Sequence, residues 1–161
     1  MHQWYLAKVK YVKQFEDGKL KRVNEPYLID AVSFTDCEAR IYEEIAPSIR
    51  GEFIIDSITK VDYADIFLYE DADVWHEAKV QYVSVDADSG REKKVTNKFL
   101  VTAHTTKEAY DRVKDSLSGM MVSYEIPAVK ETKIVEIFAF NGEREKITEG
   151  SAIDKAIDEV Q

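Results

Sequence analysis

The chain has 161 residues, of which 45% are hydrophobic and 33% are charged, as expected for a soluble globular protein with its own core. A net charge of −9 at pH 7 argues against broad, charge-driven binding to nucleic acid, and the single cysteine, Cys37, excludes an internal disulfide. The first ten residues lack the apolar segment of a signal peptide, and no apolar run is long enough to cross a bilayer, so we expect a cytoplasmic protein without a membrane partner.

The first predicted strand occurs twice. The stretch WYLAKVKYV at residues 4–12 returns as WHEAKVQYV at residues 75–83, with six of nine positions identical. Further matches follow at offsets of 71 or 72 residues, through Ala31 and Ala103 to Tyr69 and Phe140. Because separated segments agree in order, the sequence predicts a tandem duplication of one structural unit.

Each copy predicts a hairpin followed by a helix. Alternating apolar and polar residues indicate a strand at residues 4–12, and a turn at Gly18 leads into a second strand at residues 22–32. Pro26 lacks an amide hydrogen, which favours an edge or a bulge at that point. A capping box at Thr35 and Glu38, and another at Thr105 and Glu108, predicts where each helix starts. The expected apolar ladders of the two helices are Ile41, Ile45 and Ile49, and Ala109, Val113 and Leu117. The caps match at an offset of 70 and the ladders do not, which leaves the helix register open by a residue or two.

Long extended segments at residues 53–69 and 124–140 complete the copies, and each is expected to bend or split near Thr59 or Lys130. The predicted fold is α+β, a tandem duplication of a β-β-α-β(-β) unit that forms a pseudo-two-fold antiparallel sheet assembly. The copies span residues 1–70 and 75–140, joined by an acidic linker at 71–74. Residues 141–161 are predicted to form a turn at Asn141–Gly142 and a short C-terminal helix, within one compact domain overall.

The two faces of the first strand differ in character. Ala7, Val9 and Tyr11 are expected to pack under the helix, whereas the opposite face combines tryptophan with lysine in both copies. Large aromatic residues usually have a partner. Three explanations stay open: packing of the two copies sheet to sheet, a homodimer surface, or a ligand-binding face. The candidate binding residues are Trp4, Lys8, Lys10, Trp75 and Lys79.

The motifs of common catalytic and metal sites are missing from the sequence. The six glycines form no phosphate-binding loop, the three histidines are scattered, and no nucleophile elbow occurs. Asp65 and Glu136 recur at matching places, an arrangement that is more typical of the solvent face of a strand than of an acid/base pair. No catalytic residue, cofactor or metal is therefore predicted.

Two short motifs carry a family resemblance. With KVKY at residues 8–11 and FTD at residues 34–36, the chain resembles domain-of-unknown-function family 4494, uncharacterised proteins of bacteria and phages. The family's second motif reads V-T-D, so Phe34 departs from it. The resemblance implies a bacterial or phage setting and no functional residues.

Three functions are compatible with these observations. The first is a non-enzymatic interaction module for a protein partner or a second copy, favoured by the duplication and the tryptophan-bearing face. The second is single-stranded nucleic-acid binding, in which Trp4 and Trp75 stack bases and the lysines follow phosphates. The nucleic-acid hypothesis is supported by residues 1–24, which contain six basic and two acidic residues. The third is a small-molecule binder or enzyme with a cleft between the copies and Asp65 and Glu136 as candidates.

Overall fold

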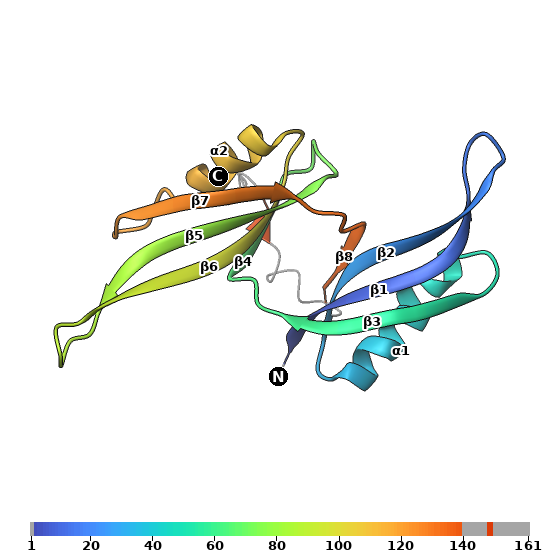
Figure 1. The fold of residues 1–161 in the computed structure, drawn as a ribbon, viewed down its shortest axis with the longest axis horizontal. Helices are drawn as coiled ribbons and strands as arrows, with labels where there is room; N and C mark the ends of the chain where they lie inside the picture. The colour runs from blue at the N-terminus through green and yellow to red at the C-terminus, as the bar shows by residue number, and fades with distance from the viewer. Residues whose placement is uncertain (1, 140–147, 150–161) are drawn as a thin grey trace, which may run out of the picture. The chain divides into compact units, whose positions relative to one another are not determined.

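The chain divides into two compact units, and the computed structural model describes residues 2–139 and 148–149 (Figure 1). Unit 1 comprises Met1–Asp62 and Lys133–Arg144, and unit 2 comprises Tyr63–Thr132 and Glu145–Gln161. The predicted Asn141–Gly142 turn and C-terminal helix lie outside the described residues. Neither helix of the described part is long and apolar enough to span a membrane.

Each unit combines one sheet with one helix. The elements of unit 1 are β1 (Gln3–Gln14), β2 (Leu20–Ala31), α1 (Phe34–Glu44), a 3-10 turn (Ala46–Ser48), β3 (Phe53–Val61) and β8 (Glu136–Phe138). Those of unit 2 are β4 (Asp65–Leu68), β5 (Trp75–Val85), β6 (Glu92–Thr102), α2 (Thr106–Ser116), β7 (Tyr124–Glu131) and β9 (Thr148–Glu149). The predicted α+β class is confirmed, as is the split of both long extended segments, which are interrupted at residues 62–64 and 132–135.

The strand orders of the two sheets, β3-β1-β2-β8 and β7-β5-β6-β4-β9, match over four strands, and β9 is an additional fifth strand of the second sheet. The first three strands of each are antiparallel, but β8 runs parallel to β2 and β4 runs parallel to β6. The predicted antiparallel pairing is therefore right for the first three strands of each sheet and wrong for the fourth. A parallel pair needs a long connection instead of a hairpin turn, and β4 and β8 reach their partners through such connections.

The fourth strand of each sheet comes from the other half of the sequence (Figure 1). β4 follows β3 along the chain but pairs with β6 of unit 2, and β8 follows β7 but pairs with β2 of unit 1. The pairings are equivalent, because Tyr27 lies opposite Glu136 and Phe99 lies opposite Asp65. The compact units thus cut across the predicted repeats, whose boundaries at 1–70 and 75–140 stay a prediction about the sequence.

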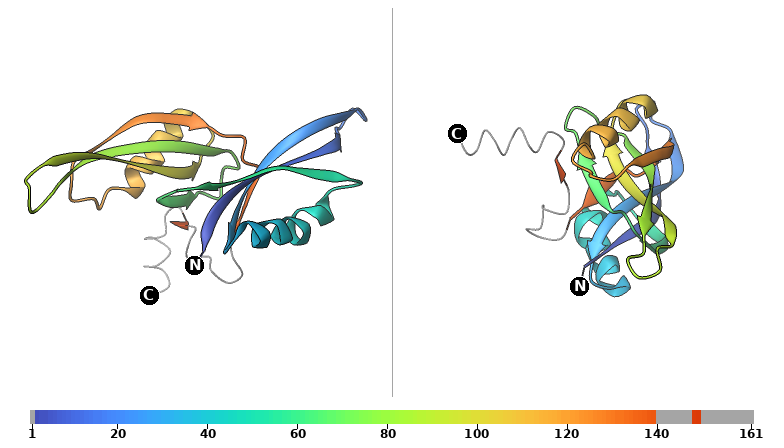
Figure 2. Two further views of the ribbon diagram at one scale, coloured as in Figure 1. Left: turned by 60° about the horizontal axis from the view of Figure 1, so that its bottom comes forward. Right: turned by 90° about the vertical axis from the view of Figure 1, so that its left-hand side faces the viewer.

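One face of each sheet packs against the helix of its unit, as Figure 2 shows for α1. In unit 1 the core joins Tyr5, Ala7 and Val9 of β1 to Ile41 of α1. In unit 2 the core includes Ala78 and Val80 of β5 together with Val113 of α2. The predicted inward positions Ala7 and Val9 are confirmed, and Tyr11 is partly buried against the same core. We call the face of each sheet opposite to its helix the open face, although Leu28 and Leu100 on that face are buried.

The helix caps correct the predicted register. α1 begins after Ser33, whose hydroxyl accepts a hydrogen bond from the Asp36 amide at 3.0 Å, so the predicted cap at Thr35 is wrong. The predicted cap of α2 is confirmed, since the Thr105 hydroxyl accepts from the Glu108 amide at 3.1 Å. Ser33 and Thr105 are 72 residues apart, the offset that also relates Ile41 to Val113. The two helices therefore share one register, in which Cys37, Ile41 and Ile45 correspond to Ala109, Val113 and Leu117.

Candidate functional site

The five predicted binding residues fall into two groups. Trp4 and Trp75 are only 9% and 6% exposed, and neither belongs to the core beneath the helix of its unit. Stacking on bases needs an exposed ring, so the structure gives the tryptophans no support as a stacking platform. Lys8, Lys10 and Lys79 are exposed on the open faces, Lys8 and Lys10 in unit 1 and Lys79 in unit 2. A binding role for the five residues stays a prediction.

Exposed aliphatic side chains gather on the open face of unit 1, beside the β1–β2 hairpin. Val12, Leu20 and Ile54 are 47%, 66% and 68% exposed. The sheet register puts them on one face: Val12 lies opposite Arg22, Leu20 opposite Gln14, and Ile54 opposite Lys10. We call this surface the hairpin patch, and it consists of Lys10, Val12, Leu20, Arg22 and Ile54. It combines three apolar side chains with two cations.

A pocket of about 420 Å³ lies at the hairpin patch. Four patch residues line it, and Tyr11, Glu52 and Phe53 contribute further walls. Tyr11 and Phe53 also pack against the core of unit 1, so this part of the pocket wall is anchored from beneath the sheet. The volume lies within the range of about 300–1,000 Å³ that is common for ligand pockets.

A β-bulge shapes the charged border of the patch. The register between β1 and β3 shifts after Lys8, which leaves Asp56 as the extra residue of β3. The Asp56 carboxylate receives the Lys10 ammonium at 3.0 Å and the Asn24 amide at 3.3 Å. The hydrogen bond from Lys10 lowers the pKa of Asp56 below its ordinary value. Arg22, by contrast, forms no ion pair within the part of the chain that the structure describes, which leaves its guanidinium available to an anion.

Beneath the sheet, two tyrosines share one carboxylate. The hydroxyl of Tyr11 donates to Glu25 Oε1, the Tyr27 hydroxyl donates to the same oxygen at 3.3 Å, and Lys13 Nζ lies 3.4 Å from Glu25 Oε2. Burial, followed by the hydrogen bond to Glu25, raises the pKa of Tyr11 to about 12. Burial likewise raises the pKa of Tyr27. Both phenols therefore stay protonated near neutral pH, and the cluster is suited to holding the pocket wall in place.

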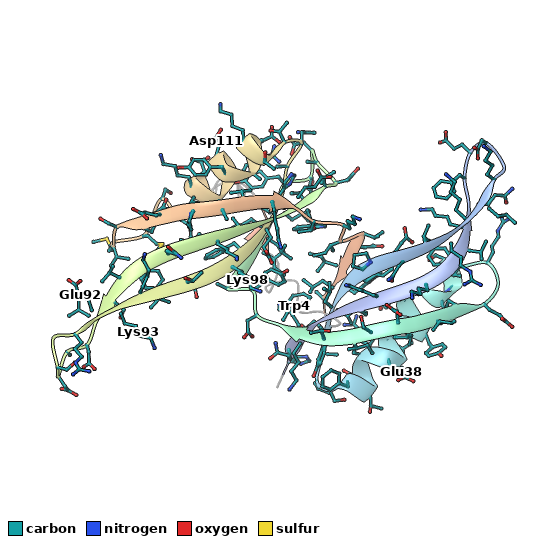
Figure 3. All side chains as sticks on the ribbon, viewed as in Figure 1. Trp4, Glu38, Glu92, Lys93, Lys98 and Asp111 are labelled. Carbon is teal, nitrogen blue, oxygen red and sulfur yellow. The ribbon has the colours of Figure 1, made fainter. Side chains whose placement is uncertain are left out.

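Unit 2 carries different side chains at the positions equivalent to the patch. Val83 lies opposite Lys94 as Val12 lies opposite Arg22, so these two positions keep their character. Glu92 of unit 2 stands at the position of Leu20, and it pairs with Val85. Glu125 stands at the position of Ile54, and it pairs with Gln81. Figure 3 shows Glu92 near the end of the β5–β6 hairpin. Unit 2 thus keeps two exposed aliphatic side chains on this face, Val83 and Val85, but carries glutamates where unit 1 has Leu20 and Ile54.

A second cluster, at the start of α2, resembles a metal site only in composition. Asp71, His104 and Glu108 place potential ligand atoms within 4.8 Å of one another. Those atoms already serve other bonds: Glu108 Oε1 accepts from His104 Nδ1 at 2.8 Å, and Asp71 Oδ2 accepts from Arg112 Nη2 at 2.7 Å. A guanidinium inside the cluster also repels a metal cation. The cluster therefore caps the helix and joins it to the loop after β4.

The two recurring acids occupy equivalent strands in different units. Asp65 lies in β4, where its Oδ1 accepts from the Ile66 amide at 2.8 Å, and Glu136 is exposed in β8. Exposure of Glu136 agrees with the solvent-face interpretation. An acid/base role for the two residues stays a hypothesis.

The hairpin patch was missed by reasoning from the sequence. Alternation along β2 from Leu28 back to Leu20 was enough to place Leu20 and Arg22 on the open face. Ile54 could not be placed in the same way, because the bulge at Asp56 reverses the alternation along β3.

One of the comparisons with known proteins found a match. A family model described as a domain of unknown function, DUF4494, matches residues 3–140. No curated protein and no solved structure matches the chain.

Proposed function

We propose that this chain, which belongs to the DUF4494 family, is a non-enzymatic binding module that recognises a protein partner through the hairpin patch of unit 1. The observation that carries the proposal is the cluster of three exposed aliphatic side chains on one open face. Exposed apolar side chains that gather on one face are a feature of interaction sites, whereas single exposed apolar residues need no explanation. The setting we propose is the cytoplasm of a bacterium or of a phage-infected cell.

We also infer that the two sequence repeats arose by duplication and then diverged at the patch. Support comes from the matching strand orders and from equivalent pairings at offsets of 71 and 72 residues. In this view unit 1 presents the binding face, and unit 2 carries glutamates at two of the equivalent positions. Glutamate is therefore a substitution that this fold accepts there.

The experiment compares the proteins captured by three forms of the full chain. Leu20→Glu with Ile54→Glu gives unit 1 the residues of unit 2, and Val83→Glu with Val85→Glu is the matched control on the open face of unit 2. We expect partners captured from a lysate of the source cells, quantified by mass spectrometry, to be lost with the first variant and kept with the control. Equal capture by all three forms would contradict the proposal.

Single-stranded nucleic-acid binding is a second candidate, favoured by the shared face of Lys8, Lys10 and Arg22. The patch offers aliphatic side chains where base stacking needs aromatic ones. This alternative therefore ranks below a protein partner. A small molecule bound in a cleft between the repeats also stays a hypothesis.

A further inference from the structure

We propose that the hairpin patch binds an acidic peptide segment in which carboxylates flank aliphatic side chains. The inference rests on the proposed function and names the chemistry of the partner. It assigns the aliphatic side chains of the peptide to the surface formed by Val12, Leu20 and Ile54. It assigns the carboxylates to Lys10 and Arg22.

The aliphatic part of the partner follows from the shape and character of the patch. Val12, Leu20 and Ile54 are each about half exposed or more, so they keep apolar surface that a partner can bury. Removing apolar surface from water gains roughly 25 cal/mol per Å². The pocket between β1, β2 and the start of β3 can take a branched aliphatic side chain against Phe53.

The acidic part follows from the charges around the patch. Arg22 is free of ion pairs in the described part of the chain, and its planar guanidinium can hold a carboxylate with two parallel hydrogen bonds. Lys10 already faces Asp56, and Glu52 lines the pocket, so the immediate border is not uniformly basic. The wider hairpin adds positive charge, because residues 8–22 hold six basic side chains against Glu16 and Asp17, although Lys10 and Lys13 are paired with Asp56 and Glu25. An acidic segment is therefore attracted to this end of unit 1, although the whole chain carries a net charge of −9.

The side chains of the hairpin patch disfavour nucleic acid as its ligand. The patch has no exposed aromatic ring of its own. Phe15, at the nearby hairpin, lies outside the patch, and the ammonium groups of Lys13 and Lys21 lie 5.9 Å and 5.5 Å from its ring centroid. Aliphatic side chains gain little from contact with bases, and they gain most from other aliphatic groups.

The test is fluorescence anisotropy with the full chain and a matched set of labelled probes. Three synthetic peptides of equal length contain glutamate with leucine, glutamate with serine, and lysine with leucine, and the fourth probe is a mixed-sequence single-stranded DNA. We expect saturable, salt-sensitive binding of the glutamate–leucine peptide alone. We expect about tenfold weaker binding for Leu20→Glu with Ile54→Glu, and also for Arg22→Glu, and no change for Val83→Glu with Val85→Glu. Circular dichroism verifies that each variant is folded.

Each other outcome overturns the inference in a distinguishable way. Preference for the lysine–leucine peptide contradicts the assigned charge, and tighter binding of the DNA supports the nucleic-acid alternative. If the glutamate–serine peptide binds as tightly as the glutamate–leucine peptide, the assigned aliphatic contact is refuted. Patch-dependent capture of proteins without binding of the glutamate–leucine peptide overturns this inference but leaves the proposed function standing. Peptide binding that the patch variants do not weaken places the contact elsewhere and removes the support for both.

Discussion

Arg40 joins three segments of unit 1 from a buried position on α1. Its guanidinium donates from Nη1 to the Asp30 carbonyl at the end of β2 at 2.5 Å, and from Nη2 to the Ala139 carbonyl after β8 at 2.9 Å. We expect Arg40→Met to lower the free energy of unfolding by about 2–3 kcal/mol, because buried carbonyl oxygens lose their donors while the packing volume is kept. Urea denaturation followed by circular dichroism measures the change.

Two other arginines provide the controls for that measurement. Arg50 is exposed, so Arg50→Met is expected to change stability by no more than about 0.5 kcal/mol. Arg112 is the counterpart in unit 2, where it donates to the Thr102 carbonyl at 2.8 Å and pairs with Asp71, which is exposed. We expect Arg112→Met to cost less than Arg40→Met, since water can replace part of that pairing. An equal, small effect at all three positions would show that Arg40 does not hold β8.

At the scale of elements, the start of α2 carries a cap whose strength we expect to depend on pH. Both ring nitrogens of His104 face acceptor oxygens, with Glu108 Oε1 at 2.8 Å from Nδ1 and the Asp71 carbonyl at 2.8 Å from Nε2. Only the protonated ring can donate to both oxygens at once. The hydrogen bond to Glu108, with that to Asp71, raises the pKa of His104, and the hydrogen bond from the His104 amide lowers the pKa of Glu108.

The direction of each shift fixes the pH range in which this cap stabilises the helix. Because the pKa of His104 is raised, its contribution to the free energy of folding is complete below the ordinary value of 6.5. That contribution is lost as the pH rises through the raised pKa. A lowered glutamate pKa gives a contribution that is present above 4.5 and is lost as the pH falls. We expect NMR titration to find the His104 pKa above 6.5, and to find it lowered in Glu108→Gln. A His104 pKa that is the same in both proteins would refute the pairing.

Local pattern predicted the elements well where one physical signal dominated. Alternation along β1 separated Ala7 and Val9 from Lys8, because a half-buried strand repeats every two residues. The start of α1 was misplaced because Ser33 and Thr35 are both acceptable caps, and only the contact of the backbone amide of Asp36 with the Ser33 hydroxyl distinguishes them. The bulge at Asp56 had no sequence signal at all, and so neither did the orientation of Ile54.

At the scale of the molecule, the sequence could not show which sheet each fourth strand joins. β4 reads DIFL and β8 reads EIF, so either segment presents a similar apolar pattern to β2 or to β6. The choice is made by pairing between residues that are distant in sequence, such as Ile66 with Leu100 and Leu28 with Ile137. Pairing of this kind leaves no mark on local periodicity, which is why the predicted repeats and the compact units differ.

The exchange of strands predicts how the chain behaves when it is cut once. A protease site inserted after Asp73, in the exposed loop between β4 and β5, would divide the folded protein into two fragments. Each unit would then contain strands of both fragments, with β4 held in unit 2 and β8 held in unit 1. We expect the fragments to elute together in size-exclusion chromatography and to separate only in denaturant.

Phe67 makes this prediction specific to strand exchange. It stacks on Phe99 of β6 at a centroid distance of 5.6 Å and belongs to the core of unit 2, although its own strand lies on the first fragment. Phe67→Ala is therefore expected to lower the denaturant concentration at which the cut fragments separate, by removing apolar contact between fragments within one unit. Amides of β4 should also stay protected from hydrogen exchange after cleavage of the wild-type chain. Fragments that separate in buffer, or that lose protection in β4 at once, would show that the exchanged strands do not hold the two halves together.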